Sequence, residues 1–509
     1  MKPAAIFCSL FVLVTLLDCF VLSVHITSNL HARNVNETNS QSPYYYKQFI
    51  DHHNKLYGTF SQKFFVNSTY YKPDGPIFLH TPGEDPIDPM VVKASGISEI
   101  VASFNGLLIV IEHRYYGESY PPIKNLTTPN MKFLTVNQAL ADFAEFIKNP
   151  PTDIIKIPKN AKWIFVGGSY AGNLATWMRK KFPKLVFAAW ASSAPLLAKL
   201  DFFEYDLAIG HALPCRDRVA DAFKLFIDPI LLSGNRTQIA SLKSQFGLDV
   251  LDDDQDFASA ISHPINLMVQ SYFPPTTPSE IDTIATFCGA FAKAPDNKPE
   301  TSTLILAQAI KFYLNITGLV TPDAIKKIFA TSALTTSIVP NNLVSFVYQY
   351  CTEFGWYQTA PKPPKQRFRS QIVDREYYQK QCNFLFPEIP PPHVKKINHQ
   401  FGGNTGEFDP WKPLTISEST HKTISRNTVF LIKNASHIND LRFPTSVDND
   451  SLKCARKFII ETLAKWLCLK CITDVSGFVK CHQTHLKIDM STPKLDPYAC
   501  PLANTISRS

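Results

Sequence analysis

A serine between glycines, placed after an apolar run and before a helix-like segment, limits the folds open to this chain. The apolar run 163–166 is followed by the six residues 167–172, Gly-Gly-Ser-Tyr-Ala-Gly, and then by a segment compatible with an amphipathic helix over 173–182. Strand, serine and helix in this order predict a nucleophile elbow, whose small neighbours let Ser169 adopt a strained conformation. Ala171 replaces the last glycine of the usual G-x-S-x-G pattern and is small enough to keep the turn.

Two other interpretations of this segment remain open. One is a glycine-rich turn that only connects a strand to a helix. The other is a phosphate-binding loop, which is disfavoured because the segment contains neither G-x-x-x-x-G-K-[ST] nor G-x-G-x-x-G.

The composition is that of a folded protein with room for two or three domains. The chain has 509 residues, of which 45% are hydrophobic and 12% aromatic. The net charge of +8 comes from basic residues scattered along the chain, without a basic tract, so nucleic-acid binding is disfavoured.

Residues 1–24 have the features of a secretory signal peptide, with Lys2 before an apolar stretch over 4–17. Asp18 interrupts the apolar run, which argues against an uncleaved membrane anchor, and no later segment is long enough to span a bilayer. Seven N-x-[ST] sequons support the secretory route. Their asparagines are Asn36, Asn67, Asn125, Asn235, Asn315, Asn434 and Asn449.

The sequence predicts an α/β sheet domain that is interrupted by a helical insertion. Over 41–200, apolar runs at 76–79, 107–111 and 163–166 alternate with a helix capped by Thr135, which indicates a parallel sheet with helices on both faces. Residues 201–388 have helical spacing and few strand signals, and we expect an insertion there. The sheet domain resumes over 389–467, with a strand at 429–432 and a closing helix at 451–467.

Nine cysteines remain after removal of the signal peptide, and in an oxidising compartment most should pair. Four of them lie in the insertion, so two internal disulfides are natural there. In the tail, 468–509, C-x-x-C and C-x-x-x-H could hold zinc, but disulfides are favoured in a secreted chain. The tail residues concerned are Cys468, Cys471, Cys481, His485 and Cys500.

A nucleophilic serine needs a general base and a group that orients that base. In α/β-hydrolases these follow the serine in the order acid, then histidine, each on a loop after a strand. His437 comes just after the predicted strand 429–432, and Asp409 precedes it in Phe-Asp-Pro-Trp. We therefore expect Ser169, Asp409 and His437 to form a triad.

Several segments resemble the secreted and lysosomal proline-specific serine peptidases, which include Pro-X carboxypeptidase, dipeptidyl peptidase II, thymus-specific serine protease and fungal prolyl endopeptidases. The resemblance runs from about residue 45 to 467, and its most specific part is Glu-His-Arg-Tyr-Tyr-Gly-Glu-Ser at 112–119. The other matching segments are 50–52, 58–60, 75–78, 82–84, 167–172, 191–195, 351–356, Asp409-Pro410-Trp411 and His437.

The resemblance implies an α/β-hydrolase fold with a mainly helical cap, no cofactor or metal, and cleavage after proline in peptide substrates. It implies Ser169 as nucleophile, His437 as base and Asp409 as orienter. It also implies an oxyanion hole formed by the Tyr170 N–H and a second donor at Gly83 or Glu84. A rigid, apolar proline ring suits an aromatic pocket, for which Trp411 and Trp356 are the candidates, although both could equally be core residues.

The same resemblance, with the position of the cysteines in the insertion, predicts the pairs Cys215 with Cys288 and Cys351 with Cys382. It predicts a secreted or lysosomal/vacuolar enzyme with a mildly acidic optimum, which requires that burial disfavour the charged form of His437. The sequence leaves open exopeptidase or endopeptidase action and the oligomeric state, including a homodimer.

The chain departs from the family at Ala171, at Asn173, where some members carry an apolar pocket residue, and over 398–408, which is shorter than usual before Asp409. A lipase or esterase on the same fold is a second hypothesis, against which stands the lack of an HGGG-type segment. A catalytically silent binding protein is the third, and the short segment before Asp409 is its only support.

Overall fold

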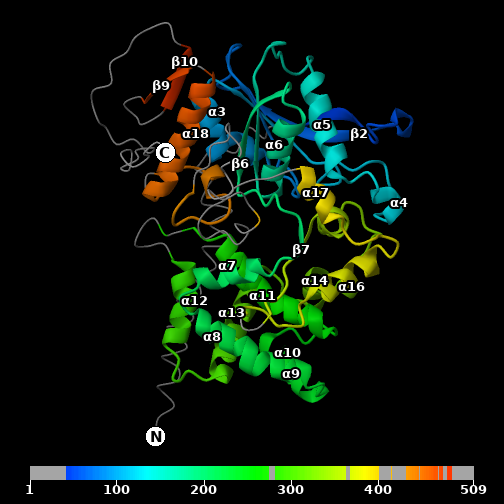
Figure 1. Ribbon diagram of the computed structural model, residues 1–509, viewed down its shortest axis with the longest axis vertical. Coiled ribbons are helices and arrows are strands. Elements are labelled where there is room, and N and C mark those ends of the chain that lie inside the picture. The colour runs from blue at the N-terminus through cyan, green and yellow to red at the C-terminus, as the bar shows by residue number, and fades with distance from the viewer. Residues whose placement is uncertain are drawn as a thin grey trace. The chain divides into compact units, whose positions relative to one another are not determined.

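The computed structural model describes residues 42–273, 275, 281–362, 367–400, 414, 431–445, 448–467, 469–473 and 479–483. The predicted signal peptide, most of the tail, Asp409 and Trp411 lie outside these residues. The chain forms two compact units (Figure 1). Within the described residues, Asp201–Thr335 and Trp356–Leu385 form one unit, and the segments before, between and after them form the other.

A six-stranded sheet forms the centre of the second unit, and its strand order is β1-β2-β4-β3-β5-β6. β2 pairs antiparallel with β1 and with β4, whereas β4, β3, β5 and β6 are parallel to one another. This is the α/β-hydrolase architecture that the sequence predicts. The strands are β1 (Tyr44–Phe49), β2 (Thr59–Asn67), β3 (Ile77–His80), β4 (Leu107–Ile111), β5 (Trp163–Gly168) and β6 (Val186–Ser192).

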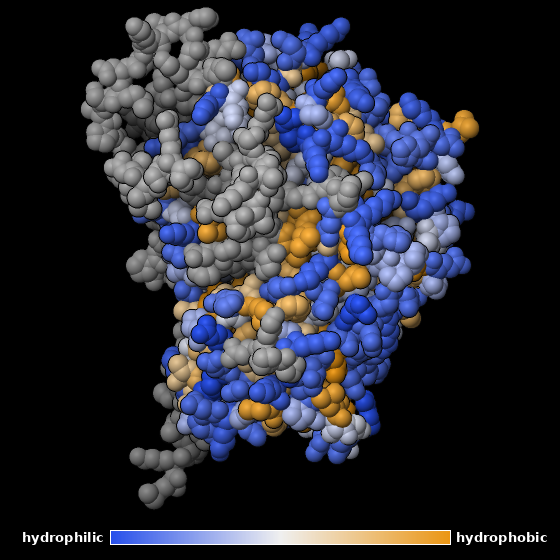
Figure 2. Space-filling view, viewed as in Figure 1, coloured by the Kyte–Doolittle hydropathy of each residue, from blue (hydrophilic) through white to orange (hydrophobic). Residues whose placement is uncertain are grey.

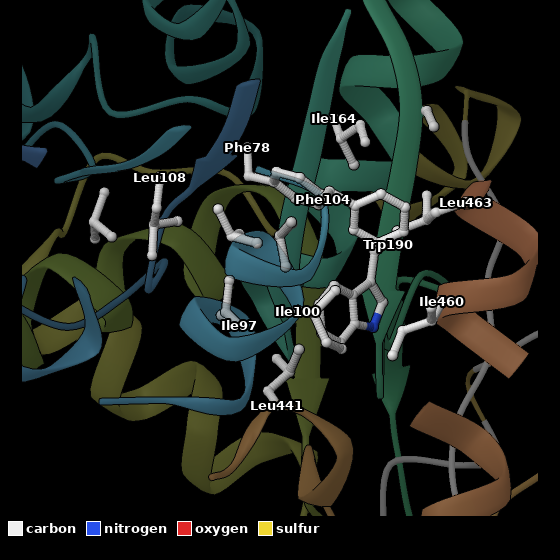
Figure 3. Close-up of a cluster of buried hydrophobic side chains, with 14 of the residues drawn as sticks. Phe78, Ile97, Ile100, Phe104, Leu108, Ile164, Trp190, Leu441, Ile460 and Leu463 are labelled. Carbon is white, nitrogen blue, oxygen red and sulfur yellow. The ribbon is translucent and has the colours of Figure 1, made fainter. Parts of the chain in front are cut away.

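Helices cover both faces of this sheet because its parallel strands are apolar on both sides. On one face, α3 (Gly96–Ser103) and α18 (Asp450–Leu467) surround Trp190 of β6, as Figure 3 shows. On the other face, Phe143 of α5 (Val136–Lys148) makes an edge contact with Phe165 of β5. The expected cap of α5 is present, since the Thr135 side chain accepts a hydrogen bond from the Gln138 N–H.

The remaining regular elements of the sheet unit are short helices and turns. These elements are η1 (Lys55–Tyr57), α2 (Pro89–Lys93), α4 (Thr128–Met131), α6 (Tyr170–Lys181), α15 (Asn342–Gln349), η4 (Tyr350–Phe354), α17 (Val394–Gln400) and η7 (Asn439–Leu441). Among them, α6 begins at Tyr170, three residues before the helix that the sequence predicts.

The other unit is mainly helical, and residues 336–355, which the prediction placed in the insertion, belong to the sheet unit. The predicted disulfide Cys215–Cys288 is present in the helical unit, and the structure also contains Cys351–Cys382. The helices of the helical unit are α7 (Glu204–Ala212), α8 (Arg216–Asp221), η2 (Ala222–Ile227), α9 (Asp228–Leu232), α10 (Arg236–Phe246), α11 (Asp254–Gln270), α12 (Thr283–Ala292), α13 (Pro299–Ile316), α14 (Pro322–Phe329), η3 (Thr331–Ala333) and α16 (Arg375–Leu385).

Two pairs of short strands complete the described structure: β7 (Lys199–Asp201) with β8 (Gly355–Tyr357), and β9 (Leu469–Thr473) with β10 (Val479–Gln483). Of the predicted strand 429–432, only Leu431 and Ile432 are described. They belong to no strand, and Leu431 is 38% exposed, which does not fit a buried strand position.

Among the described helices, none combines the length and the apolar character needed to cross a bilayer. On the face shown in Figure 2, most of the coloured surface is hydrophilic and apolar side chains occur in separate groups.

The segment 112–119 is held by two buried charged side chains. Glu112 accepts hydrogen bonds from the Ile87 N–H (3.1 Å), the Glu118 N–H (2.8 Å) and the Ser119 hydroxyl (2.7 Å). The Arg114 guanidinium donates to both carboxylate oxygens of Asp142 on α5, at 2.6 and 2.5 Å, and both side chains are fully buried. These contacts explain why so many polar residues occur together in this apolar part of the chain.

Arg114→Ala should destabilise the protein by about 3–5 kcal/mol, because it leaves the Asp142 carboxylate buried without its main counter-charge. Chemical unfolding followed by intrinsic fluorescence measures the change. Arg236→Ala is the matched control, since Arg236 pairs with Asp254 at the surface and should leave the midpoint nearly unchanged. Equal midpoints for the two variants would contradict the importance of the buried pair.

Candidate active site

Ser169 occupies the turn between β5 and α6 in a strained conformation. Its φ of 55° and ψ of −131° are unusual for a residue with a side chain. The Ser169 N–H donates to the Ser192 carbonyl at 2.9 Å, which ties the turn to the end of β6. The predicted geometry of a strained serine between a strand and a helix is therefore confirmed.

The first turn of α6 meets the loop that follows β3. Gly83 in this loop has a φ of +82°, and a Cβ at this position would lie 3.1 Å from the Ala171 nitrogen and 3.2 Å from the Tyr170 ring. A side chain there would push the loop away from Ser169. The first N–H groups of a helix have no partner within it, and Tyr170 is the first residue of α6. The structure thus brings together the residues expected to form an oxyanion hole.

Glu84, next in this loop, is kept neutral over a wide pH range. Its Oε2 is buried and has no hydrogen-bond partner in the described part of the chain. Burial, with the neighbouring carboxylate of Asp85, raises the pKa of Glu84 to about 8. Below that pH the side chain carries a proton and can donate a hydrogen bond, which an ionised carboxylate cannot do.

The loop that carries His437 packs against the serine turn. A Cβ on Gly168 would lie 2.7 Å from Cγ2 of Ile438 and 2.6 Å from Cδ1 of Leu441. The residue before the nucleophile therefore touches the residue after His437, and glycine is needed for this approach. His437 itself is only 5% exposed, which agrees with the burial expected from its proposed role.

Four hydrogen bonds fix the His437 loop. The Ile438 N–H donates to the Ser193 hydroxyl at 2.9 Å, and the Ser436 N–H donates to the Asn439 side chain at 2.7 Å. The Asp440 carboxylate accepts from the Trp190 indole N–H at 3.0 Å and from the Ser192 hydroxyl. The loop is therefore anchored to the end of β6, beside the strand that delivers Ser169.

A second polar network holds the Tyr170 side chain behind the elbow. The Gln349 amide donates to the Tyr170 hydroxyl at 2.8 Å, and the Tyr116 hydroxyl donates to Gln349 at 2.5 Å. Burial lowers the pKa of His113 to about 4, so this imidazole is neutral. Since His113 Nδ1 donates to the Arg114 carbonyl at 2.7 Å, its Nε2 accepts from the Tyr170 hydroxyl at 3.1 Å.

Glu353, the next buried carboxylate near Tyr170, is bonded to the start of α5. Its carboxylate accepts from the Val136 N–H at 3.0 Å, at the start of that helix. Burial raises its pKa to about 7, against the lowering effect of this hydrogen bond. Burial, with the nearby carboxylate of Glu353, raises the pKa of Tyr170 well above its ordinary value, so its phenol remains protonated.

The other predicted site residues are placed as follows. Asp409 and Trp411 lie outside the described residues, and Trp356 is buried in β8. Asn173 is fully buried on α6, where its amide nitrogen donates to the Pro195 carbonyl at 3.1 Å and its Oδ1 has no partner in the described chain. Among the described residues, no group of three His, Cys, Asp or Glu side chains could hold a metal. The tail cysteines considered for zinc have no described side chains.

The sequons differ in exposure, and their occupancy stays a prediction. Asn235, Asn315 and Asn434 are exposed, while Asn67, Asn125 and Asn449 are half-buried and Asn36 is not described.

Sequence reasoning missed the residues that hold the serine turn and the His437 loop in place. His113, Tyr116 and Glu353 belong to segments that carry the family resemblance, but no role could be read from their spacing. Gln349 and Asp440 had no distinguishing signal, because each acts on a partner far away in the chain.

Comparison with known proteins gives the family. The model of the serine carboxypeptidase S28 family matches residues 48–459. The chain is 28% identical to the serine protease vicPa of Bipolaris victoriae, with 83% of this chain and 88% of that protein covered. It is 29% identical to human thymus-specific serine protease, with 83% and 85% covered. It is 26% identical to a "Probable extracellular serine carboxypeptidase" of Arthroderma benhamiae, with 74% and 59% covered.

A fluorophosphonate probe should label Ser169 and no other serine, because the elbow exposes one activated hydroxyl. Ser169→Ala should abolish labelling while the thermal unfolding midpoint stays close to that of the parent protein. Gel fluorescence and peptide mass spectrometry measure the labelling. Ser241→Ala, at an exposed serine on α10, is the control and should be labelled as strongly as the parent protein. Labelling that persists in Ser169→Ala would show that the nucleophile is elsewhere.

Proposed function

Because the chain belongs to the serine carboxypeptidase S28 family and is a serine-type peptidase, we propose that it cleaves peptide bonds on the carboxyl side of proline. Ser169, Asp409 and His437 form the catalytic triad in this proposal. The observation that carries it is the contact of Gly168 with Ile438, which sets the His437 loop against the serine turn.

In the proposed reaction, the Ser169 hydroxyl attacks the carbonyl carbon of the scissile bond. His437 accepts the hydroxyl proton and then donates it to the leaving amine, while Asp409 orients the imidazole. The bond between serine oxygen and substrate carbon forms an acyl-enzyme. Water, deprotonated by His437, then hydrolyses this ester and restores the serine.

The Tyr170 N–H and the Gly83–Glu84 loop stabilise the negative oxygen of the tetrahedral intermediate. A donor of this kind contributes about 3 kcal/mol to lowering the barrier. A protonated Glu84 carboxyl can serve as such a donor, since its Oε2 is buried without a partner in the described residues. The hydrogen bonds from Gln349 and to His113 hold the Tyr170 ring, and thereby support the start of α6.

The proposed specificity for proline rests on the resemblance to proline-specific serine peptidases and on two tryptophans in the segments that carry this resemblance. We propose that Trp411 and Trp356 contribute to a pocket for the proline ring, which is apolar and rigid. We further propose that the protein acts outside the cell or in a lysosome or vacuole, after removal of residues 1–24. The sequons and the disulfide Cys215–Cys288 are in keeping with this route.

The rate should fall as the pH rises through about 8, the pKa of Glu84, because loss of its proton removes a donor and places a negative charge beside the oxyanion. Above that pH, kcat/KM of the parent protein should fall about tenfold per pH unit, as for a single titrating group. Glu84→Gln, which donates without titrating, should lose this decline.

Glu118→Gln is the matched control, because Glu118 is an exposed carboxylate that pairs with Lys63. This variant should keep the decline of the parent protein. If kcat/KM falls in the same way above pH 8 in Glu84→Gln and Glu118→Gln, Glu84 does not donate to the oxyanion.

A chromogenic peptide with proline before the scissile bond should be hydrolysed at least about tenfold faster than its alanine analogue, since the alanine leaves apolar pocket surface unfilled. Steady-state kcat/KM on the two peptides measures the ratio. Trp411→Ala should reduce the ratio more than it reduces the rate on the alanine peptide. Equal rates on both peptides would contradict the proline pocket, and an optimum at pH 8 or above would contradict acidic operation.

A further inference from the structure

A cavity of about 740 Å³ lies at the edge of the sheet unit, away from the serine turn. Its volume falls within the range of about 300–1,000 Å³ that is usual for small-molecule sites. It is formed by the start of β1, the end of β2 with the loop that follows, the end of α2, and the loop after α5. The lining residues used below are Tyr44, Asn67, Thr69, Tyr71 and Lys156.

One wall of this cavity is the sequon Asn67-Ser68-Thr69. The Asn67 side chain is half-buried, and one N–H of its amide donates to the Val92 carbonyl at 2.5 Å. Its Oδ1 accepts from the Thr69 N–H at 3.0 Å. In N-glycosylation, the sugar replaces the second hydrogen of the Asn67 amide nitrogen. The contacts with Val92 and Thr69 fix the direction in which an attached sugar leaves the asparagine.

The remaining walls offer the groups that a carbohydrate requires. The Tyr44 ring is 38% exposed and is held by a tilted contact with Phe64, with ring centroids 5.5 Å apart. A partly exposed ring of this kind can pack against the apolar face of a pyranose. The Tyr71 hydroxyl is buried without a hydrogen-bond partner in the described chain, and Lys156 is exposed. Both can bond to sugar hydroxyl or acetamido oxygens.

We propose that Asn67 is N-glycosylated and that the first N-acetylglucosamine residues of its glycan occupy this cavity. In the modification, the Asn67 nitrogen forms a bond to C1 of a lipid-pyrophosphate-linked oligosaccharide. The C1–O bond to the pyrophosphate breaks, and the nitrogen loses one proton. Because the sugar is tethered to a wall of the cavity, its effective concentration there is in the mM range, and weak contacts suffice to hold it. The cavity has no role in the proposed peptidase reaction.

The test uses the full chain secreted by eukaryotic cells. The native protein is treated with peptide N-glycosidase in ¹⁸O water, and the release of each glycan is followed by mass spectrometry of its peptide. Asn235, exposed at the start of α10, is the reference site. Release at Asn67 should be at least about tenfold slower than at Asn235, equivalent to ~1.4 kcal/mol of docking. After unfolding, the two rates should be equal.

Tyr44→Ala should increase the release rate at Asn67 because it removes the ring from the cavity. Tyr70→Ala is the matched control, since Tyr70 is 57% exposed, lies beside the sequon and does not line the cavity. Equal unfolding midpoints for the two variants establish that both are folded. An unmodified Asn67 would overturn the proposal and leave the cavity to a free ligand. Equal release at Asn67 and Asn235 in the native protein would also overturn it.

Discussion

The proposed site depends on the carboxyl ends of β5 and β6, where one short stretch of backbone supports both catalytic loops. The Ser192 carbonyl accepts from the Ser169 N–H, and the Ser192 hydroxyl donates to Asp440 in the His437 loop. Residues more than 240 positions apart are thus fixed by neighbouring atoms of the same strand end. The glycine at 168 makes this possible, since any side chain there would collide with the His437 loop.

Burial keeps two titratable side chains near the serine turn uncharged at neutral pH. His113 is neutral because its pKa is lowered to about 4, and Glu84 has a pKa of about 8, so both are uncharged near neutral pH. The Tyr170 hydroxyl then needs only neutral partners, which Gln349 and His113 supply. A charged group in this place would disturb the field at the proposed oxyanion hole, where preorganised dipoles have their largest effect.

Much of this arrangement could be predicted from the sequence, because patterns among neighbouring residues are enough to indicate its strands, its helix cap and its serine turn. Apolar runs, the Thr135 cap and the glycine-bounded Ser169 each depend on near neighbours, and all three predictions are confirmed. The partners of Tyr170 could not be predicted, since Gln349 lies 179 residues away and no pattern marks it. Of the predicted strand at 429–432, the two described residues belong to no strand. Leu431 is apolar but exposed, so its apolar character did not indicate a buried position.

The raised carboxyl pKa values also connect stability with the proposed acidic operation. Glu84 and Glu353 have folded-state pKa values of about 8 and about 7, against 4.5 for an ordinary glutamate. Between about pH 4.5 and these values, the folded state holds protons that the unfolded state has lost. The free energy of unfolding therefore falls as the pH rises through this window, because the unfolded state binds fewer protons. The buried His80 and His113 of the same unit act in the opposite direction, because their pKa values are lowered to about 4 and the unfolded state binds more protons than the folded state below about pH 6.5. Burial of Glu84 and Glu353 therefore stabilises the sheet unit toward acidic pH, while burial of the two histidines limits this gain at the most acidic values.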